Sequence, residues 1–320
     1  MAVIGQDIDE AIRFLKDGNL VGIPTETVYG LAGNALDTEA VLKIFEVKER
    51  PAFDPLIVHI GRFEAMSEFV IYVPEKARKL AINFWPGPLT LILPKNKRIP
   101  EVVTSGLPTV AVRIPDHPLT LRLLNSLPFP LAAPSANPFG YVSPTSARHV
   151  ADQMGHKISY ILDGGVCDIG IESTIIGFEG QDPVIYRLGG KSIEEIENLI
   201  GKVKTVLASS SRPDAPGMLL AHYAPGSKKV LLGQWHEYQD QINMHETVLI
   251  RFKDTDEKFP LNRQAVLSEK GDLREAAKNL FTTLRRFDIK GISYIVAELM
   301  PEEGFGRAIN DRLRRAASVD

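Results

Sequence analysis

Three short polar stretches bring together side chains that could bind charged small molecules. The first, PTETVYGLAG, covers residues 24–33 and presents Thr25, Glu26 and Thr27 directly after an apolar run. Pro24 ends the predicted strand LVGIP, so these side chains are expected in a turn. Hydroxyls and a carboxylate in a turn can grip an amine or a carboxylate ligand, and a purely structural turn explains them equally well.

The second stretch, EVKERPAFDPLIVHI at residues 46–60, places two cations between a predicted helix and an apolar strand. Lys48 and Arg50 lie at the end of the helix, and His59 lies in the strand. A cation at a helix C-terminus is stabilised by the helix dipole, which accounts for one of the two. A guanidinium fork beside an ammonium is better suited to a polyanion, because the two can share phosphate oxygens.

The third stretch, AAPSANPFGYVSPTS at residues 132–146, follows a predicted strand and precedes a predicted helix. It contains Ser135, Asn137 and Ser143 among three prolines and a glycine. Hydroxyls, an amide and exposed backbone N–H groups just before a helix are typical of an anion-binding loop. With the cations of the second stretch, this loop predicts a phosphate site.

Other nucleotide and metal motifs fail at required positions. IYRLGGKS at residues 185–192 has Ile185 where a phosphate loop needs glycine, and GFGRAI at residues 304–309 has Ile309 where a dinucleotide motif needs its third glycine. A turn that caps a helix explains each of them better. Cys167, the one cysteine, excludes a Cys-based zinc site and is expected to be a buried packing residue. No metal site made by protein side chains is predicted, whereas Mg²⁺ carried in by a nucleotide stays open.

The pattern along the chain predicts an α/β protein with two domains. Residues 1–201 mix short apolar strands with amphipathic helices, one of them starting at a predicted cap, Thr38. Several strands follow one another without a helix between them, so we expect a mixed, twisted sheet with flanking helices. Residues 202–225 have the composition of a linker, but Met218, Leu219, Leu220, His222 and Tyr223 are costly to expose, so part of it should dock. Residues 226–320 alternate strands and helices and predict a small Rossmann-like α/β domain.

Charge and length narrow the function classes. The 320 residues carry a formal net charge of −3, so the whole chain is not a basic nucleic-acid binder, although the part after residue 201 has slightly more cations than anions. No apolar run reaches the length of a membrane span or a signal peptide. We therefore expect a cytoplasmic protein without a membrane partner.

Together, these stretches resemble the YrdC-domain family. The order PTETVYGL, K-x-R-P, PLIVH, S-A-N and S-P-T is the pattern of that family over about residues 5–200. LAHYAPG at residues 220–226 and GFGRAINDRLRRAA at residues 304–317 resemble the long form with a second domain. The resemblance implies a YrdC-like catalytic domain followed by a linker that closes over the active site.

The resemblance also implies an enzymatic reaction. In it, L-threonine, bicarbonate or CO₂, and ATP with Mg²⁺ give threonylcarbamoyl-AMP and pyrophosphate, which makes the chain a nucleotidyltransferase. The expected partners are downstream proteins that transfer the threonylcarbamoyl group to tRNA. In the family, Lys48 and Arg50 would be the catalytic cations.

Site residues follow from matching the family's motifs to this sequence. The nucleotide would be bound by Lys48, Arg50, Asp54, Thr109, Ser135, Asn137, Ser143, Arg187, His222 and Tyr223. L-threonine would be bound by Thr27, His59, Arg113, Ala133 and Ser173, with Arg113 as the partner of its carboxylate. Asp54 departs from the family, which often has Asn there, and a carboxylate near ATP needs a cation, a metal or the ribose as its partner.

Two other functions stay open at this stage. An RNA-binding module without ATP turnover would use a basic face, and weak RNA contact is compatible with the charge of the C-terminal part. A carbamoyl transferase of the hydrogenase-maturation type would need zinc-finger cysteines, which a chain with a single cysteine lacks.

Overall fold

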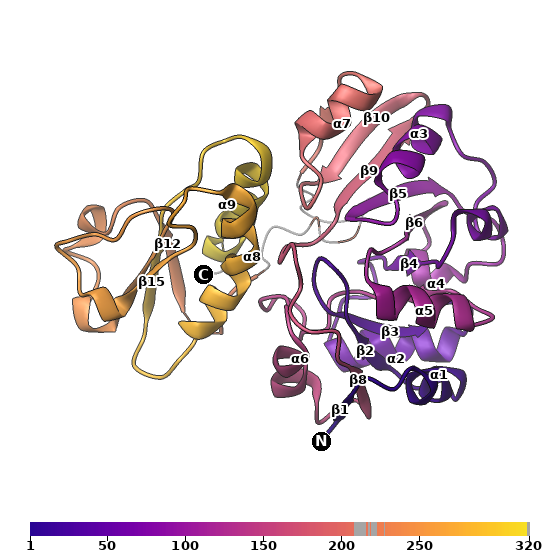
Figure 1. Cartoon of the computed structure of the whole chain (residues 1–320), viewed down its shortest axis with the longest axis horizontal. Helices are drawn as coiled ribbons and strands as arrows, with labels where there is room; N and C mark the ends of the chain where they lie inside the picture. The colour runs from indigo at the N-terminus through magenta and orange to yellow at the C-terminus, as the bar shows by residue number, and fades with distance from the viewer. Residues whose placement is uncertain (208–215, 217, 219–222, 227, 319–320) are drawn as a thin grey trace.

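A computed structural model describes residues 1–207, 216, 218, 223–226 and 228–318 (Figure 1). Within them, the chain forms one eleven-stranded sheet and one four-stranded sheet. Among these residues, none of the helices is long and apolar enough to cross a membrane. Figure 1 shows the smaller sheet to one side, with its helices turned toward the larger domain.

The large sheet is mixed, as the sequence predicts. Its spatial order is β1-β8-β2-β3-β7-β4-β6-β5-β9-β10-β11. β4 and β6 are parallel, whereas β6 and β5, and β9 and β10, are antiparallel. The strands are β1 (Val3–Gly5), β2 (Val21–Ile23), β3 (Gly30–Asn34), β4 (Ile57–His59), β5 (Leu89–Pro94), β6 (Thr109–Arg113), β7 (Leu131–Ala132), β8 (Tyr160–Leu162), β9 (Thr174–Glu179), β10 (Asp182–Arg187) and β11 (Lys204–Thr205).

Helices pack around this sheet and bury its apolar side chains. They are α1 (Ile8–Lys16), α2 (Thr38–Lys48), α3 (Glu75–Phe84), α4 (Glu101–Thr104), α5 (Pro118–Ser126), α6 (Ala147–Met154) and α7 (Ile193–Ile200), with a 3₁₀ turn η1 (Phe63–Glu68). The helices expected from the sequence are present, but two strands differ from the expectation. β1 is a strand that the sequence analysis did not predict, and β3 begins inside the stretch expected to be a turn.

The N-termini of two helices are fixed by capping side chains. α7 begins at Ser192 with a capping box, so the failed phosphate-loop motif is a helix cap, as predicted. The predicted cap of α2 at Thr38 is wrong by one residue. Asp37 is the N-cap, because its carboxylate accepts a hydrogen bond from the N–H of Glu39 at 3.0 Å, and Thr38 is already helical.

The second sheet is entirely parallel among the described residues, in the order β12-β15-β13-β14. It confirms the prediction of a small Rossmann-like domain. Its elements are β12 (Lys229–Leu232), β13 (Thr247–Arg251), β14 (Gln264–Val266), β15 (Tyr294–Ala297), α8 (Leu273–Arg286), α9 (Gly304–Ala317) and the 3₁₀ turns η2 (Trp235–Tyr238), η3 (Met244–Glu246) and η4 (Leu261–Arg263).

The two domains share a continuous core. The largest cluster of buried apolar side chains includes residues of both, and Tyr223 stacks on Phe281 of α8 at 5.5 Å between ring centroids. Gly170 has a φ of +78°, and a Cβ there would lie 2.5 Å from the Cα of Lys278 in α8. Only glycine therefore permits this approach of loop and helix.

The predicted linker is partly docked. Its first residues include β11, which pairs with β10, and the side chains of Met218 and Tyr223 are buried. Docking is therefore confirmed for these two positions, whereas Leu219, Leu220 and His222 lie outside the described residues.

Candidate active site

A pocket with about 590 Å³ of empty space opens where the three polar stretches meet. Most of the predicted site residues line it, and they come both from the set predicted for the nucleotide and from the set predicted for threonine. These are Thr27, Arg50, His59, Arg113, Ala133, Ser135, Ser173, Arg187 and Tyr223.

Strand register brings His59 and Arg113 together. β4 and β6 are parallel, and His59 lies opposite Arg113 at their carboxyl ends. Both side chains are almost fully buried. Burial, followed by the charge of Arg113, lowers the pKa of His59 to about 3. The imidazole is therefore neutral at physiological pH and can contact a ligand without adding charge.

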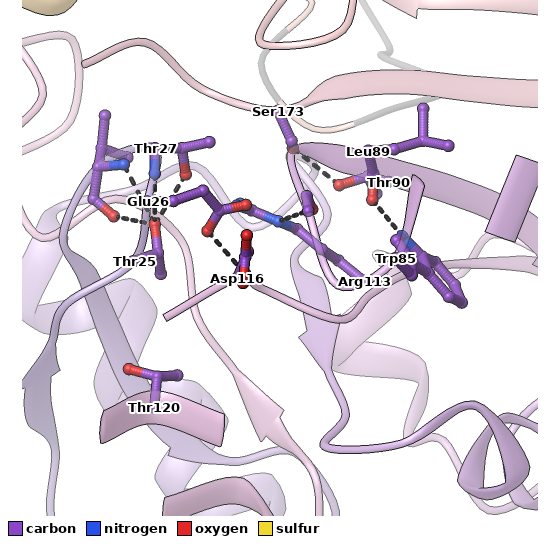
Figure 2. A network of polar contacts seen from close by, with 12 residues as sticks. Thr25, Glu26, Thr27, Trp85, Leu89, Thr90, Arg113, Asp116, Thr120 and Ser173 are labelled. Carbon is purple, nitrogen blue, oxygen red and sulfur yellow. Dashed lines mark hydrogen bonds and ion pairs between the residues drawn. The ribbon is translucent and has the colours of Figure 1, made fainter. Parts of the chain in front are cut away.

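Arg113 is held by a buried carboxylate (Figure 2). Its Nη2 lies 2.6 Å from Oε1 of Glu26, and its Nε donates to the carbonyl of Gly87 at 3.2 Å. The other oxygen of Glu26 accepts from the N–H of Asp116 at 3.0 Å. A guanidinium has five N–H donors, so these two bonds orient the group and leave donors for a ligand carboxylate.

The turn after β2 places Thr27 on the pocket wall. Thr25 Oγ1 lies 2.7 Å from Thr27 Oγ1, donates to the carbonyl of Val28 and accepts from the N–H groups of Thr27 and Val28. Figure 2 shows this cluster beside Glu26. The hydroxyl of Thr25 thus bonds backbone groups of its own turn and fixes their conformation. The stretch is therefore both a structural turn and part of the pocket.

On the opposite wall, Ser173 is fixed by two elements. Its Oγ lies 2.8 Å from Thr90 Oγ1 of β5 and accepts from Arg187 Nη2 at 3.0 Å. Arg187 ends β10, and its Nε donates to the carbonyl of Ser173 at 3.0 Å. Burial lowers the pKa of Arg187 to about 10, so its guanidinium remains protonated at physiological pH.

Arg50 and Asp54 form a buried ion pair beside the pocket. Arg50 Nη2 lies 2.8 Å from Asp54 Oδ2 and also donates to the carbonyl of Pro55 at 2.9 Å, while Nε donates to the carbonyl of Asp54 at 3.0 Å. Arg50 lines the pocket, but Asp54 does not. The departure from the family is thus accounted for, because the carboxylate faces a cation and orients it.

Lys48 does not line the pocket. Its Nζ donates to the carbonyls of Ser135 and Asn137, both at 2.6 Å, and its side chain is buried. Burial lowers its pKa, and the charge of Arg50 lowers it further. Glu49 takes a left-handed conformation with φ 55°, so the chain turns sharply between Lys48 and Arg50. Lys48 therefore fastens the S-A-N loop, which differs from the expected sharing of phosphate oxygens with Arg50.

The remaining predicted residues lie around the pocket. Asn137 donates to the carbonyls of Pro138 and Tyr141, and Ser143 donates to Glu172 Oε1 at 2.6 Å, so both stabilise the wall from behind. Thr109 lines a smaller adjoining cavity that shares Pro55 and Pro216 with the pocket. His222 lies outside the described residues.

Glu172 is the charged wall residue that the sequence analysis missed. It lines the pocket and is buried, directly before Ser173 in the otherwise uncharged run GIESTI. An acid in such a run is the signal that could have found it, because carboxylates are rarely buried without a partner. The wall is completed by Thr25, Val28, Gly30, Pro55, Ile57, Pro134 and Pro216.

Comparisons with known proteins match both domains. A family model described as "Telomere recombination" (Sua5, YciO and YrdC) matches residues 13–189, and one described as "Threonylcarbamoyl-AMP synthase, C-terminal domain" matches residues 191–318. Threonylcarbamoyl-AMP synthase of Pyrococcus abyssi is 44% identical, with 96% of this chain and 93% of the relative covered. That of Bacillus subtilis is 41% identical, with 97% and 92% covered.

Solved structures agree with the fold of the whole chain. The crystal structure of P. abyssi Sua5 complexed with L-threonine superposes with a TM-score of 0.90 at 40% identity, and covers 99% of this chain and 97% of that one. With family models over both parts and relatives similar along the full length, the chain belongs to the threonylcarbamoyl-AMP synthase family.

Proposed function

We propose that this chain is an L-threonylcarbamoyladenylate synthase that converts L-threonine, bicarbonate or CO₂, and ATP into threonylcarbamoyl-AMP and pyrophosphate. The observation that carries the proposal is the pocket, whose wall combines the guanidiniums of Arg50, Arg113 and Arg187. Relatives similar over the full length are named for this activity, and one of them was crystallised with L-threonine. These relatives favour an enzyme over an RNA-binding module.

The pocket divides into two sides that suit the two substrates. His59 and Arg113, joined by strand register, would receive the threonine, with Thr27, Ala133 and Ser173 around it. Arg50, Ser135, Arg187 and Tyr223 would receive the nucleotide. Arg113 would bind the threonine carboxylate because a planar fork matches it bidentately, and neutral His59 would not repel the amine.

The chemistry proceeds in two steps. The threonine nitrogen attacks the carbon of CO₂ and loses a proton, which gives a carbamate. A carbamate oxygen then attacks the α-phosphorus of ATP, and pyrophosphate leaves with the electrons of the broken P–O bond. The protein's part is to hold the carbamate in line with the phosphate and to neutralise developing charge, which makes it a nucleotidyltransferase.

Mg²⁺ belongs to the proposal as the companion of ATP, whose phosphates supply much of its coordination. Throughout the described part of the chain, no group of three or more His, Cys, Asp and Glu side chains could hold a metal ion. The product would pass to the proteins that transfer the threonylcarbamoyl group to tRNA.

A coupled assay tests the function. Purified protein with Mg·ATP should release pyrophosphate only when L-threonine and bicarbonate are both present, in a one-to-one ratio with threonylcarbamoyl-AMP detected by mass spectrometry. Release without threonine would refute the assignment. Tight, salt-sensitive RNA binding without turnover would support the RNA-binding module instead.

We expect Lys48→Met to reduce the free energy of unfolding by about 1–3 kcal/mol, because two buried carbonyls lose their donor. The loosened Ser135 loop should in turn lower kcat about tenfold. Denaturant unfolding and steady-state kinetics measure the two effects. The control is Lys157→Met, since Lys157 reaches the same end of α2 but is partly exposed and pairs with an exposed Glu49. A variant that keeps wild-type stability but loses turnover would indicate that Lys48 contacts the phosphates directly.

A further inference from the structure

Helix α9 of the C-terminal domain reaches the wall of the pocket through one side chain. Arg312 is completely buried, and its Nε donates to Glu172 Oε2 at 2.9 Å. Its Nη2 donates to the carbonyl of Leu188 at 2.8 Å, and its Nη1 pairs with Asp311 at 2.6 Å. Figure 1 shows α9 on the side of the small domain that faces the large one.

Glu172 couples this arginine to the nucleotide side of the site. One carboxylate oxygen accepts from Arg312 and the other from Ser143 Oγ at 2.6 Å. Burial alone would raise the pKa of Glu172, but the charges of Arg312 and Arg187 and the bond from Ser143 lower it to about 2. The carboxylate is therefore ionised, and both its orientation and its charge balance depend on Arg312.

Tyr223 is the second wall residue that the C-terminal domain holds. The guanidinium carbon of Arg312 lies 5.1 Å from the centroid of its ring, within the range of a cation–π contact. The same ring stacks on Phe281 of α8 at 5.5 Å, with 23° between the planes. Tyr223 is buried and lines the pocket, so helices of the small domain fix a side chain of the catalytic site.

We propose that Arg312 is a positioning residue of the active site, and that the C-terminal domain completes the catalytic pocket by holding Glu172 and Tyr223. The proposal rests on the proposed function of the pocket. It assigns the domain a part in catalysis, because the wall that faces the nucleotide is fixed across the domain interface. A guanidinium suits this position because its three nitrogens bond Glu172, Leu188 and Asp311 separately, whereas an ammonium would have to reach all three from one atom.

A merely structural ion pair would behave differently from a positioning residue. Removing one partner of a buried pair leaves an uncompensated charge and destabilises the fold. That effect lowers the thermal midpoint but leaves kcat and the KM for ATP of the folded enzyme unchanged. The test must therefore compare kinetics of folded variants and include a variant that removes both charges.

The experiment uses the full chain with Arg312→Met, Glu172→Gln and the double variant. We expect Arg312→Met to lower kcat/KM for ATP about tenfold or more, even at temperatures where the protein is folded. In the Glu172→Gln background, Arg312→Met should lower kcat/KM for ATP by a clearly smaller factor, because the residue that Arg312 positions has already changed. The double variant should recover part of the thermal midpoint.

The control is Arg314→Met, on the same helix but exposed and paired with Glu302, which should stay within about twofold of wild type. If Arg312→Met does not fold, Arg312→Lys keeps the charge without the fork and should still show a reduced kcat/KM. Wild-type kinetics in a folded Arg312 variant, or losses that simply multiply in the double variant, would overturn the proposal. Calorimetry compares the ATP affinity of the same variants without turnover. A failure of this inference can then be told apart from a failure of the proposed reaction.

Discussion

Arg50→Ala should lower kcat/KM for ATP by about 100- to 1000-fold, the cost of removing one preorganised group that stabilises developing charge. Arg50 lines the pocket, and its Nη2 and Nε are held by Asp54 and Pro55, so the guanidinium is oriented before any ligand arrives. Pyrophosphate release at saturating threonine and bicarbonate measures the effect.

The control for Arg50 must separate catalysis from stability. Alanine leaves Asp54 as a buried carboxylate without its cation, which costs about 3–5 kcal/mol of stability. Arg50→Ala combined with Asp54→Asn should recover stability but not turnover. Arg98→Ala, which removes an exposed arginine paired with Glu68, should leave turnover unchanged. An active double variant would show that the pocket does not need a cation at this position.

The candidate site could be predicted in part because strands that are neighbours in the sheet bring the polar residues at their ends together. Apolar strands end at polar residues, and the parallel register of β4 and β6 brings His59 and Arg113 to one edge of the sheet. The antiparallel pair β9 and β10 likewise returns Arg187 to the start of β9, next to Ser173. Motifs separated by dozens of residues could therefore be expected to meet.

Side-chain directions at chain reversals could not be predicted. Lys48 and Arg50 are two residues apart, yet the left-handed Glu49 between them sends one toward the carbonyls of the Ser135 loop and the other to the pocket. A sequence motif gives residue types and their spacing, but it does not indicate that Glu49 takes a left-handed conformation. The role of Lys48 therefore needed the structure.

Contacts between the domains were the other missing part. Arg312 and Glu172 are 140 residues apart, and nothing in the segment around either residue indicates that the two meet. The sequence predicted that Met218 and Tyr223 would dock, because large apolar groups are costly to expose. It carried no signal for the surface on which they dock, since that surface forms only when two separately patterned domains pack together.

Arg113 is expected to set the affinity for L-threonine. The Glu26 pair and the bond to Gly87 fix its guanidinium at the side of the pocket proposed for threonine, next to neutral His59. A substrate carboxylate would thus meet a cation that is already oriented. Arg113→Met would leave the carboxylate of Glu26 buried without its cation, so the informative variant is Arg113→Met with Glu26→Gln.

This double variant should bind L-threonine about 10- to 100-fold more weakly, because hydrogen bonds to a charged group are lost. The affinity for ATP should change much less. Calorimetry with L-threonine and L-threoninamide gives the sharper measurement, since the amide lacks the carboxylate. Wild type should prefer threonine strongly, and the variant should bind the two almost equally. If the variant keeps the wild-type preference, the carboxylate is bound elsewhere and the pairing of Arg113 with Glu26 serves only the fold.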